Sequence, residues 1–467
     1  MMPPKETRCA EGRGRPEGEL REVARVRTQS RVTLPANLAR VSEAARRYKG
    51  TRFTALLHHV DVAALERAFR RLKRSAAPGV DGETVASYEE NLAQNLERLH
   101  AQVHSGRYRP QPVRRVYIEK ADGGQRPLGV PALEDKIVQS AVAEVLSTIY
   151  EVDFLGFSYG FRPGRSPHQA LQVLHTTFMT QYVNWVLDAD VRSFFDSVDH
   201  EWMLRMVAHR VADRRILRLI RGWLRAGVME GKRWSETVQG TPQGSGISPL
   251  LANIFMHYVL DLWVHQWRKR HARGRVIIVR YCDDFVMGFQ YEADARRMLA
   301  DLKERLAKFK LVLHEKKTRL IEFGNLASKL REQRDGGRCE TFNFLGFTHY
   351  CARSLDGRFV VKRRTDRRRL VRKLKELRAE AWRRMHAPVG VQRDWLASVL
   401  RGHYAYYGLP SNWHRLNTFY DEVRRLWYCV LNRRSQRRLS WARFNALLER
   451  FPLPRASITH PRPATAC

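Results

Sequence analysis

The spacing of apolar positions along the chain predicts both helices and strands. Apolar residues recur every three or four positions, as on one face of a helix, in three long segments: 41–73, 133–150 and 250–263. Apolar and polar residues alternate over 113–120 and 125–131, on either side of a Gly-Gly pair, which is typical of a β-hairpin. Another short strand is indicated at 342–347. The pattern as a whole predicts an α+β fold.

One stretch carries adjacent acids inside an apolar run. Residues 276–281 are mainly apolar, Asp283 and Asp284 follow, and residues 285–289 are apolar again. This predicts a hairpin whose turn holds both carboxylates, since adjacent residues in a regular strand face opposite ways. Two like charges held close together favour a cation between them, and Mg²⁺ binds carboxylates together with substrate phosphates. Taken alone, the stretch fits an ordinary exposed Asp-Asp turn equally well.

A second acidic strand is expected at 185–190. Asp188 and Asp190 share one face of it, because strand residues repeat every second position. An acid that points inward from an apolar strand is costly unless it is neutralised. The hairpin at Asp283 and Asp284, together with its metal ions, would supply the partner.

Composition narrows the class of partner. The chain has 467 residues, enough for two or three domains, and 43% of them are apolar. It contains 84 Lys plus Arg against 48 Asp plus Glu, a net charge of +36, which favours nucleic acid over an anionic membrane surface. No run of about 18 apolar residues and no apolar N-terminal leader occur. The six scattered cysteines form no CxxC pair, so they indicate neither zinc nor disulfides and fit a cytoplasmic protein.

Cations also gather in two loops. Lys120 and Arg126 flank the tip of the 113–131 hairpin. The compact charge of the Lys ammonium and the two-pronged hydrogen bonding of the Arg guanidinium both suit a triphosphate. Basic hairpin tips also serve solubility, so this signal is weak by itself. Arg162 and Arg165 lie in an aromatic-rich loop that precedes a helix, which suits contact with template or backbone phosphates.

The character of the chain changes near 355–362. Beyond this boundary come a very basic helix and a helical region dense in aromatic residues, which form core more often than they stack on bases. We expect five segments: a flexible basic tail at 1–40, a mainly helical segment at 41–110, a mixed helix and strand region at 111–355, a helical region at 362–455 and a short tail at 456–467.

Seven motifs occur together in one order. They are APGVDG from residue 77, RPLG from 126, SYGFRPGRS from 158, DADVRSFFD from 188, TPQGSGISPLLANIF from 241, YCDD from 281 and FNFLGF from 342. This combination resembles the reverse transcriptases, and in detail the reverse transcriptase/maturases encoded by bacterial group II introns, over roughly residues 45 to 455. The resemblance implies a right-hand polymerase fold. Residues 41–110 would form an N-terminal extension and the start of the fingers, 111–355 the fingers and palm, and 362–455 the α-helical thumb and RNA-binding maturase region.

The resemblance also implies roles for particular residues. Asp190, Asp283 and Asp284 would be catalytic and would bind two Mg²⁺ ions with the backbone carbonyl of Val191. The residues that would bind the incoming nucleotide are Lys120, Arg126, Phe195, Gln243 and Lys317, with Phe195 as the gate against a ribose 2′-hydroxyl. Those that would touch primer or template are Arg162, Arg165, Phe344, Leu345, Gly346 and Phe347. Those that would bind RNA are Arg367, Arg368, Arg369 and Arg372, and the 41–73 segment would touch template RNA.

The implied function is an RNA-directed DNA polymerase that extends a DNA primer on an RNA template with dNTPs. It would also bind its intron RNA to assist splicing and copy it into a target DNA as a mobile element. Two alternatives stay open: a splicing cofactor with a vestigial polymerase fold, and a host-recruited reverse transcriptase in phage defence. The intact acids argue against the first, and the basic, aromatic C-terminal region argues against the second.

Two departures from the family pattern affect these expectations. Cys282 stands where the family has Ala before the acids; it is small and apolar, so we expect it to fit, with oxidation as a new hazard. The region after 455 lacks the extra His and Cys pairs of relatives with an HNH endonuclease, so we expect no endonuclease activity.

Overall fold

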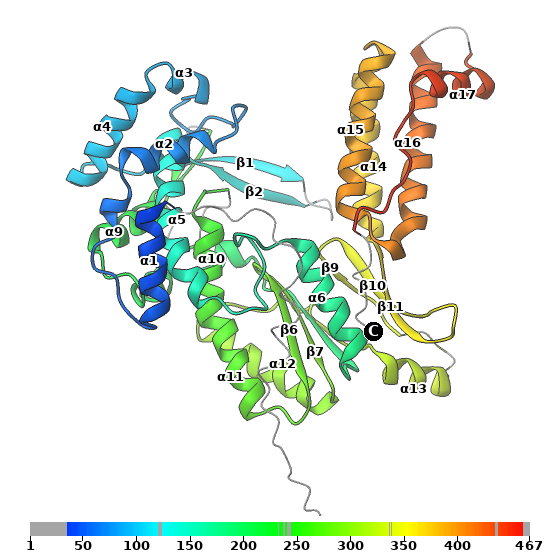
Figure 1. Ribbon diagram of the computed structural model, residues 1–467, viewed down its shortest axis with the longest axis horizontal. Coiled ribbons are helices and arrows are strands. Elements are labelled where there is room, and N and C mark those ends of the chain that lie inside the picture. Colours follow the sequence, from blue (N-terminus) through cyan, green and yellow to red (C-terminus); the bar gives the residue numbers. More distant parts are fainter. Residues whose placement is uncertain are drawn as a thin grey trace, which may run out of the picture.

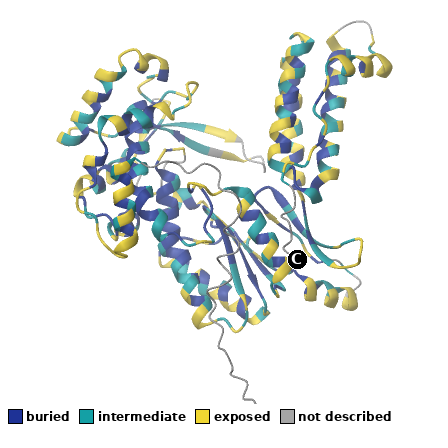
Figure 2. Cartoon of the chain, in the orientation of Figure 1, coloured by how far each residue is buried: buried dark blue, intermediate teal, exposed yellow. Residues whose placement is uncertain are grey.

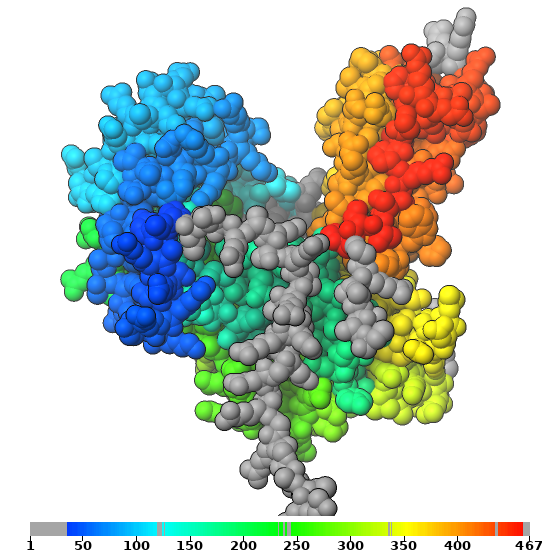
Figure 3. All heavy atoms as spheres, in the orientation of Figure 1, coloured from blue at the N-terminus to red at the C-terminus, as the bar shows by residue number. Residues whose placement is uncertain are grey.

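The computed structural model describes residues 35–119, 124–231, 233–236, 239–240, 244–335, 337, 339–434 and 438–460. These form an N-terminal lobe, a central region built on a four-stranded sheet, and a C-terminal helical bundle (Figure 1). The space-filling view shows the molecule hollowed between the N-terminal lobe and the C-terminal bundle, above the central region (Figure 3). No helix among the described residues is long and apolar enough to span a membrane.

The N-terminal lobe combines helices with a small mixed sheet. Its helices are α1 (Ala36–Arg47), α2 (Val62–Arg70), α3 (Val85–Glu89) and α4 (Leu92–Ser105), and α1 and α2 pack on α5 (Leu133–Asp153). The sheet has the order β2-β1-β4-β5, made from β1 (Val113–Glu119), β2 (Gln125–Val130), β4 (Val228–Glu230) and β5 (Arg233–Ser235). Strands β1 and β2 are antiparallel, which confirms the expected hairpin.

The single helix expected over 41–73 is wrong. Helix α1 begins within the expected tail, at Ala36, and ends before Gly50, whose positive φ of 91° starts a turn. After a short 3-10 turn at Leu57–His59, the chain resumes as α-helix beyond Asp61, whose carboxylate accepts from the Ala64 amide at 2.7 Å and caps α2. The apolar spacing was therefore right within each helix, and the break between them came from local turn and cap chemistry.

The basic face of this segment is largely paired within the protein. Arg67 and Arg71 both reach Glu144 on α5, while Arg70 pairs with Glu66 on its own helix. This region therefore offers RNA fewer uncompensated cations than its arginine count indicates.

The central sheet has the order β6-β7-β3-β8, all antiparallel neighbours. Its strands are β3 (Trp185–Ala189), β6 (Val276–Tyr281), β7 (Asp284–Phe289) and β8 (Arg319–Glu322). Side chains alternate between two cores. Leu187 and Met287 lie in the core that contains helices α10 (Ser248–Met256) and α12 (Glu292–Ala307), whereas Val186 and Val286 lie in the core that contains α6 (Pro167–Thr180). Both faces of the sheet are thus covered, and its functional residues must stand at an edge or end.

Helices connect and cover these strands (Figure 1). They are α6 (Pro167–Thr180), α7 (Phe194–Ser197), α8 (His200–Ala208), α9 (Arg214–Arg225), α10 (Ser248–Met256), α11 (Leu262–Arg270), α12 (Glu292–Ala307) and α13 (Asn325–Asp335). The helix expected over 250–263 is interrupted by one π-helical turn, His257–Asp261, between α10 and α11. Such turns re-aim side chains within a helix, and this one carries Asp261 toward β6.

A second sheet follows the central one. Its order is β11-β10-β9, with β9 (Phe342–Phe344), β10 (Phe347–Arg353) and β11 (Phe359–Thr365). The single strand expected over 342–347 is therefore two strands, because Leu345 and Gly346 both have positive φ and turn the chain. The boundary expected near 355–362 falls at the β10–β11 hairpin, and the helical region begins only at Arg367.

The C-terminal bundle has its own core. It consists of α14 (Arg367–Arg383), α15 (Val389–Tyr407), α16 (Trp413–Arg434) and α17 (Trp441–Arg450). Most of its aromatic residues face inward, among them Tyr404, Phe419, Trp427 and Phe444. Figure 2 shows this separation, with buried residues along the inner faces of the helices and exposed residues outside. The aromatic density of this region is therefore mainly core.

Candidate active site

The three acids singled out in the sequence gather at one end of the central sheet. Tyr281 pairs with Asp284, so the β6–β7 turn consists of Cys282 and Asp283 alone. Cys282 has a φ of 60°, the backbone that a two-residue hairpin turn requires at its first central position. On the neighbouring strand Ala189 pairs with Phe285, and Asp190 follows directly beyond that pair. The turn and the end of β3 thereby bring Asp190 close to Asp284.

The carboxylates repel one another. The pKa of Asp284 is raised to about 7, chiefly because surrounding protein displaces water and further because Asp283 and Asp190 stand nearby. Solvent still reaches the Asp284 side chain, which moderates the effect. Arg369, from the distant helix α14, acts in the opposite direction and lowers this pKa. A site that raises a carboxyl pKa in this way favours a bound cation or proton.

Two cations already stand beside the acids on β3. The ammonium of Lys317 lies 3.3 Å from an Asp190 oxygen, and Arg319 on β8 lies 3.4 Å from Asp188. Asp188 therefore has its own partner across the sheet, and its pKa rises to about 6 because burial outweighs the nearby arginine. Asp188 shares a strand face with Asp190, but it pairs with Arg319 across the sheet rather than joining the three acids.

The donor set suits divalent metal ions, although their binding requires some rearrangement. Carboxylate oxygens are the ligands that Mg²⁺ prefers, and the Asp190, Asp283 and Asp284 side chains supply them. Within the described ranges, however, no group of three or more His, Cys, Asp or Glu side chains is arranged to hold a metal ion. Lys317 provides the positive charge at Asp190 instead.

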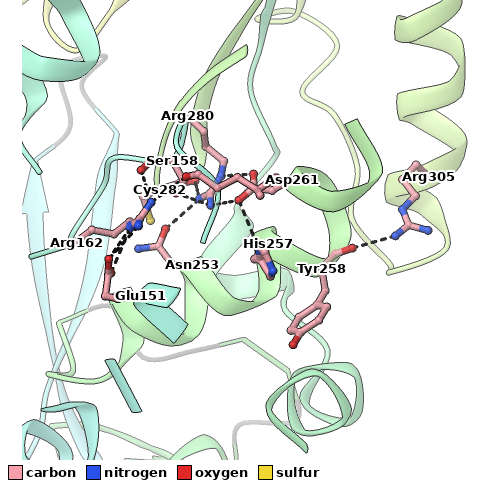
Figure 4. A network of polar contacts seen from close by, with 11 residues as sticks. Glu151, Ser158, Arg162, Asn253, His257, Tyr258, Asp261, Arg280, Cys282 and Arg305 are labelled. Atoms are coloured by element: carbon pink, nitrogen blue, oxygen red, sulfur yellow. Dashed lines mark hydrogen bonds and ion pairs between the residues drawn. The ribbon is translucent and has the colours of Figure 1, made fainter. Parts of the chain in front are cut away.

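A buried arginine fixes the β6–β7 turn from beneath. Arg280, fully buried, donates to both Asp261 oxygens at 2.7 and 2.5 Å and to Asn253 Oδ1 at 3.0 Å. It also donates to the Cys282 carbonyl at 2.8 Å and to Ser158 Oγ at 2.7 Å, as Figure 4 shows. Five hydrogen bonds satisfy its guanidinium and compensate for burying the ion pair. The sequence carried a signal for this network: a charged residue inside an apolar strand needs a buried partner.

The loop at 158–166 packs directly on the same turn. A Cβ placed on Gly160 would lie 2.4 Å from the Cys282 amide nitrogen, so only glycine allows this approach. Asn253, which binds Arg280, also donates to the Gly160 carbonyl at 2.6 Å. The loop is thus tied to the acids through backbone contact.

Arg162 does not occupy the position expected for a nucleic-acid contact. It is 7% exposed, forms two-pronged hydrogen bonds with Glu151, and donates to the Leu155 and Ser158 carbonyls. Its guanidinium serves to hold the loop, because its donors are used inside the protein. Arg165 is exposed and lies over the Tyr159 ring at 5.2 Å, so it remains a candidate for contact with template or primer.

Phe161 is a residue that the sequence reasoning missed. It has a φ of 54°, rare for a bulky residue, and 61% of it is exposed. Its ring centroid lies 6.0 Å from that of Tyr281, the residue before the β6–β7 turn. A strained loop thus displays an aromatic face beside the acids, where a base or sugar can pack against it.

The expected nucleotide-binding residues are only partly described. Lys120, Gln243 and the side chain of Arg126 lie outside the described residues. Phe195 is half-buried on α7, with its ring 5.3 Å from that of Phe194. The described end of the glycine-rich loop lies against the β1–β2 hairpin, since a Cβ on Gly244 would meet the Gly129 carbonyl at 2.7 Å.

The residues expected to grip the primer connect the central region to the bundle, and their contact with a primer stays a prediction. The side chains of Phe344, Leu345 and Phe347 are buried. The Leu345 carbonyl accepts from the Tyr406 hydroxyl at 2.9 Å, and the Gly346 carbonyl accepts from the Asp366 amide at 3.0 Å. Both partners belong to the C-terminal part of the chain, so this turn connects the bundle to the central region.

The arginines of α14 lie at the base of the bundle. Arg367, Arg368 and Arg369 are exposed, and Arg372 lies 3.5 Å from Glu376. Arg369 stands near enough to lower the pKa of Asp284, so this end of the basic helix lies toward the acids. The expectation that these four arginines bind RNA stays a prediction.

Comparison with known proteins gives the class that the chain resembles. Residues 118–349 match the family described as reverse transcriptase (RNA-dependent DNA polymerase). The chain is also similar to group II intron-encoded proteins and intron maturases.

Two relatives illustrate the extent of this similarity. Protein YkfC of Escherichia coli strain K12 is 36% identical over 244 residues, covering 46% of this chain and 64% of YkfC. Group II intron-encoded protein LtrA of Lactococcus lactis is 36% identical over 202 residues, covering 43% of this chain and 33% of LtrA. The chain thus spans between a third and just under two thirds of the length of these relatives.

Proposed function

We propose that the protein is an RNA-directed DNA polymerase encoded by a group II intron, and that it also binds its intron RNA to assist splicing. The observation that carries the proposal is that Asp190, at the end of β3, gathers with Asp283 and Asp284 at the β6–β7 turn held by buried Arg280, within the residues 118–349 that match the reverse transcriptase family. In this proposal the N-terminal lobe serves as fingers, the central region as palm and the bundle as thumb and maturase region.

The three acids would hold two Mg²⁺ ions, with the Val191 carbonyl as a further ligand. When bound, these ions would activate the primer 3′-hydroxyl and stabilise the leaving pyrophosphate. Lys317 neutralises Asp190 in the described arrangement, and its ammonium suits a triphosphate oxygen equally well. Lys120 and Arg126 would add cations to the same triphosphate.

The partners that follow are an RNA template with its DNA primer, dNTPs, the intron RNA and a target DNA. The net charge of +36 supports binding to these polyanions. Relatives named as intron-encoded proteins and maturases favour this assignment over a polymerase recruited for phage defence. The intact acids favour it over a splicing cofactor without chemistry.

Primer extension on an RNA template tests the proposal. The full chain, with dNTPs and Mg²⁺, should extend an annealed DNA primer, and the double variant Asp283→Ala, Asp284→Ala should not. The variant should still bind RNA with unchanged affinity, because the acids contribute no positive charge. Substantial extension by the double variant would place the polymerase site elsewhere.

A further inference from the structure

Two cysteines that lie apart in the sequence meet beside the second sheet. Cys339 precedes β9, and Cys351 lies on β10. Strand β9 runs antiparallel to β10 and pairs Phe342 with His349, so the chain just before β9 lies beside the residues just after His349. The two thiols are hydrogen-bonded to each other, and both are free. They form no CxxC pair, which is why the sequence pattern indicated no disulfide.

The beginning of helix α13 donates hydrogen bonds to this pair. The Gly324 amide, directly before α13, bonds to both sulfurs, and the Ser328 hydroxyl in the first turn bonds to Cys339. Gly324 has a φ of 144°, and a Cβ there would collide with the Val183 carbonyl, so only glycine brings the backbone this close. Amides and hydroxyls at the start of a helix stabilise negative charge on a sulfur.

The two thiols differ in how readily they lose a proton. The hydrogen bond with Cys351 lowers the pKa of Cys339 to about 7 despite burial, and the Gly324 amide, the Ser328 hydroxyl and the Arg331 charge act in the same direction. The pKa of Cys351 is raised, chiefly by its hydrogen bond to Cys339 and further by burial. Because the thiolate is the nucleophilic form of cysteine, Cys339 is the attacking sulfur and Cys351 keeps its proton.

The surroundings of the pair differ from those of the other described cysteines. Cys351 is partly exposed and Cys339 is 8% exposed, so a small oxidant approaches the pair from the Cys351 side. Cys282 is 3% exposed and its thiol pKa is raised, which makes it unreactive. Cys429 is exposed on α16. Cys429 therefore serves as the reference for an accessible thiol.

We propose that Cys339 and Cys351 form a redox-active pair that hydrogen peroxide converts reversibly to a disulfide. The Cys339 thiolate attacks one peroxide oxygen, the O–O bond breaks, and the departing hydroxide takes up a proton to become water. The Cys351 thiol then attacks the sulfur of the resulting sulfenic acid, forms the S–S bond and releases a second water. The two thiols lose two electrons in total, and the peroxide is reduced to two water molecules.

The disulfide would close a loop that holds the central region to the bundle. This loop contains β9 and the turn at 345–346, whose carbonyls accept from the Tyr406 hydroxyl and the Asp366 amide. A cross-link limits the conformations open to such a loop, so the oxidised connection should unfold less readily. The proposal goes beyond the proposed polymerase function and does not rest on it, because neither cysteine is assigned to that function.

Peptide mapping after mild oxidation tests the pair. Trypsin cleaves after Arg338 and Arg353 and at no position between them, so residues 339–353 leave as one peptide with both thiols. The full chain is treated with hydrogen peroxide or left reduced, and is then unfolded, alkylated and digested. The reduced chain should give this peptide with two alkyl groups. The oxidised chain should give it with none and two hydrogen atoms lighter, and dithiothreitol should restore both alkylation sites.

Three single variants assign the two sulfurs their roles. Cys351→Ser leaves the thiolate without a second thiol, so peroxide should stop at the Cys339 sulfenic acid, which dimedone traps. Cys339→Ser removes the attacking sulfur, so Cys351 should stay open to alkylation. Cys429→Ser is the matched control and should form the disulfide as the parent does. Circular dichroism checks that the variants fold, and the peptide map of the parent does not depend on them.

Three results would overturn the proposal. The first is a 339–353 peptide that keeps both alkylation sites at a peroxide concentration that fully oxidises Cys429. The second is sulfinic acid at Cys339, or a disulfide that joins this peptide to another, in place of the internal bond. The third is equally fast formation of the internal disulfide by a chain unfolded in urea, because the fold would then not be what brings the two thiols together.

Discussion

The acidic turn and the basic C-terminal bundle place their functional residues in opposite ways. At the turn, every group around Cys282 is fixed by burial: Arg280 beneath it, Asp261 beside that arginine, and Gly160 pressed against the backbone. In the bundle, the cations of α14 stand on an exposed helical surface and share few acids. The first arrangement suits chemistry that requires fixed oxygen positions, and the second suits a polyanion that is held by charge.

The difference predicts that the turn is sensitive to changes that bear no relation to catalysis. Arg280→Met leaves Asp261 as a buried, uncompensated charge, which should cost about 3–5 kcal/mol of stability and abolish extension. Urea denaturation and primer extension measure both effects. Adding Asp261→Leu to this variant should recover much of the stability, because both charges are then absent. If Arg280→Met alone lowers the free energy of unfolding by less than about 1 kcal/mol, the network does not support the turn.

Substituting single arginines of α14 separates the two regions further, because Arg369 lies on the basic helix and also affects the acidic turn. Arg369→Ala should lower extension on a preannealed primer–template at low salt by roughly tenfold or more, because its charge reaches Asp284. Arg368→Ala is the matched control, and it should weaken RNA binding while changing extension less. Both variants should keep the stability of the parent, since the positions are exposed and alanine favours helix. Equal losses of extension would assign both arginines to the same duplex contact.

Phe195 tests selectivity within the acidic region. If its ring packs against the sugar of the incoming nucleotide, Phe195→Ala opens space for a 2′-hydroxyl, and ribonucleotide incorporation should rise roughly tenfold relative to deoxyribonucleotide. Phe195→Tyr retains the ring and serves as control. Competitive incorporation of the two nucleotides gives the ratio, and an unchanged ratio in an active Phe195→Ala variant would remove this residue from the gate.

The residues that sequence predicted well are those whose partners are local. The β6–β7 turn, the β1–β2 hairpin and the positions of Asp283 and Asp284 followed from alternation and turn chemistry within a few residues. Arg162 was predicted to contact nucleic acid because the sequence does not show that Glu151, on helix α5, binds its guanidinium inside the protein. The position of Arg369 near Asp284 depends on how the whole C-terminal bundle packs against the central region. Long-range docking of this kind leaves no periodic signal in one sequence.

Cys282 should give the smallest effect. The family has alanine at this position, and Cys282→Ala keeps the Cβ while removing one buried sulfur, so stability should change by about 1 kcal/mol or less. Burial and the neighbouring Asp283 raise the pKa of the thiol above its usual range. The thiol is therefore protonated and 97% buried from solvent, and the oxidation hazard expected from the sequence should be minor. Extension by the parent and by Cys282→Ala should respond equally to mild peroxide. The informative control is Cys282→Val, because a β-branched residue at a φ of 60° is strained and should lower both stability and extension. A parent that peroxide inactivates while Cys282→Ala survives would show that the turn opens to solvent far more readily than its buried network implies.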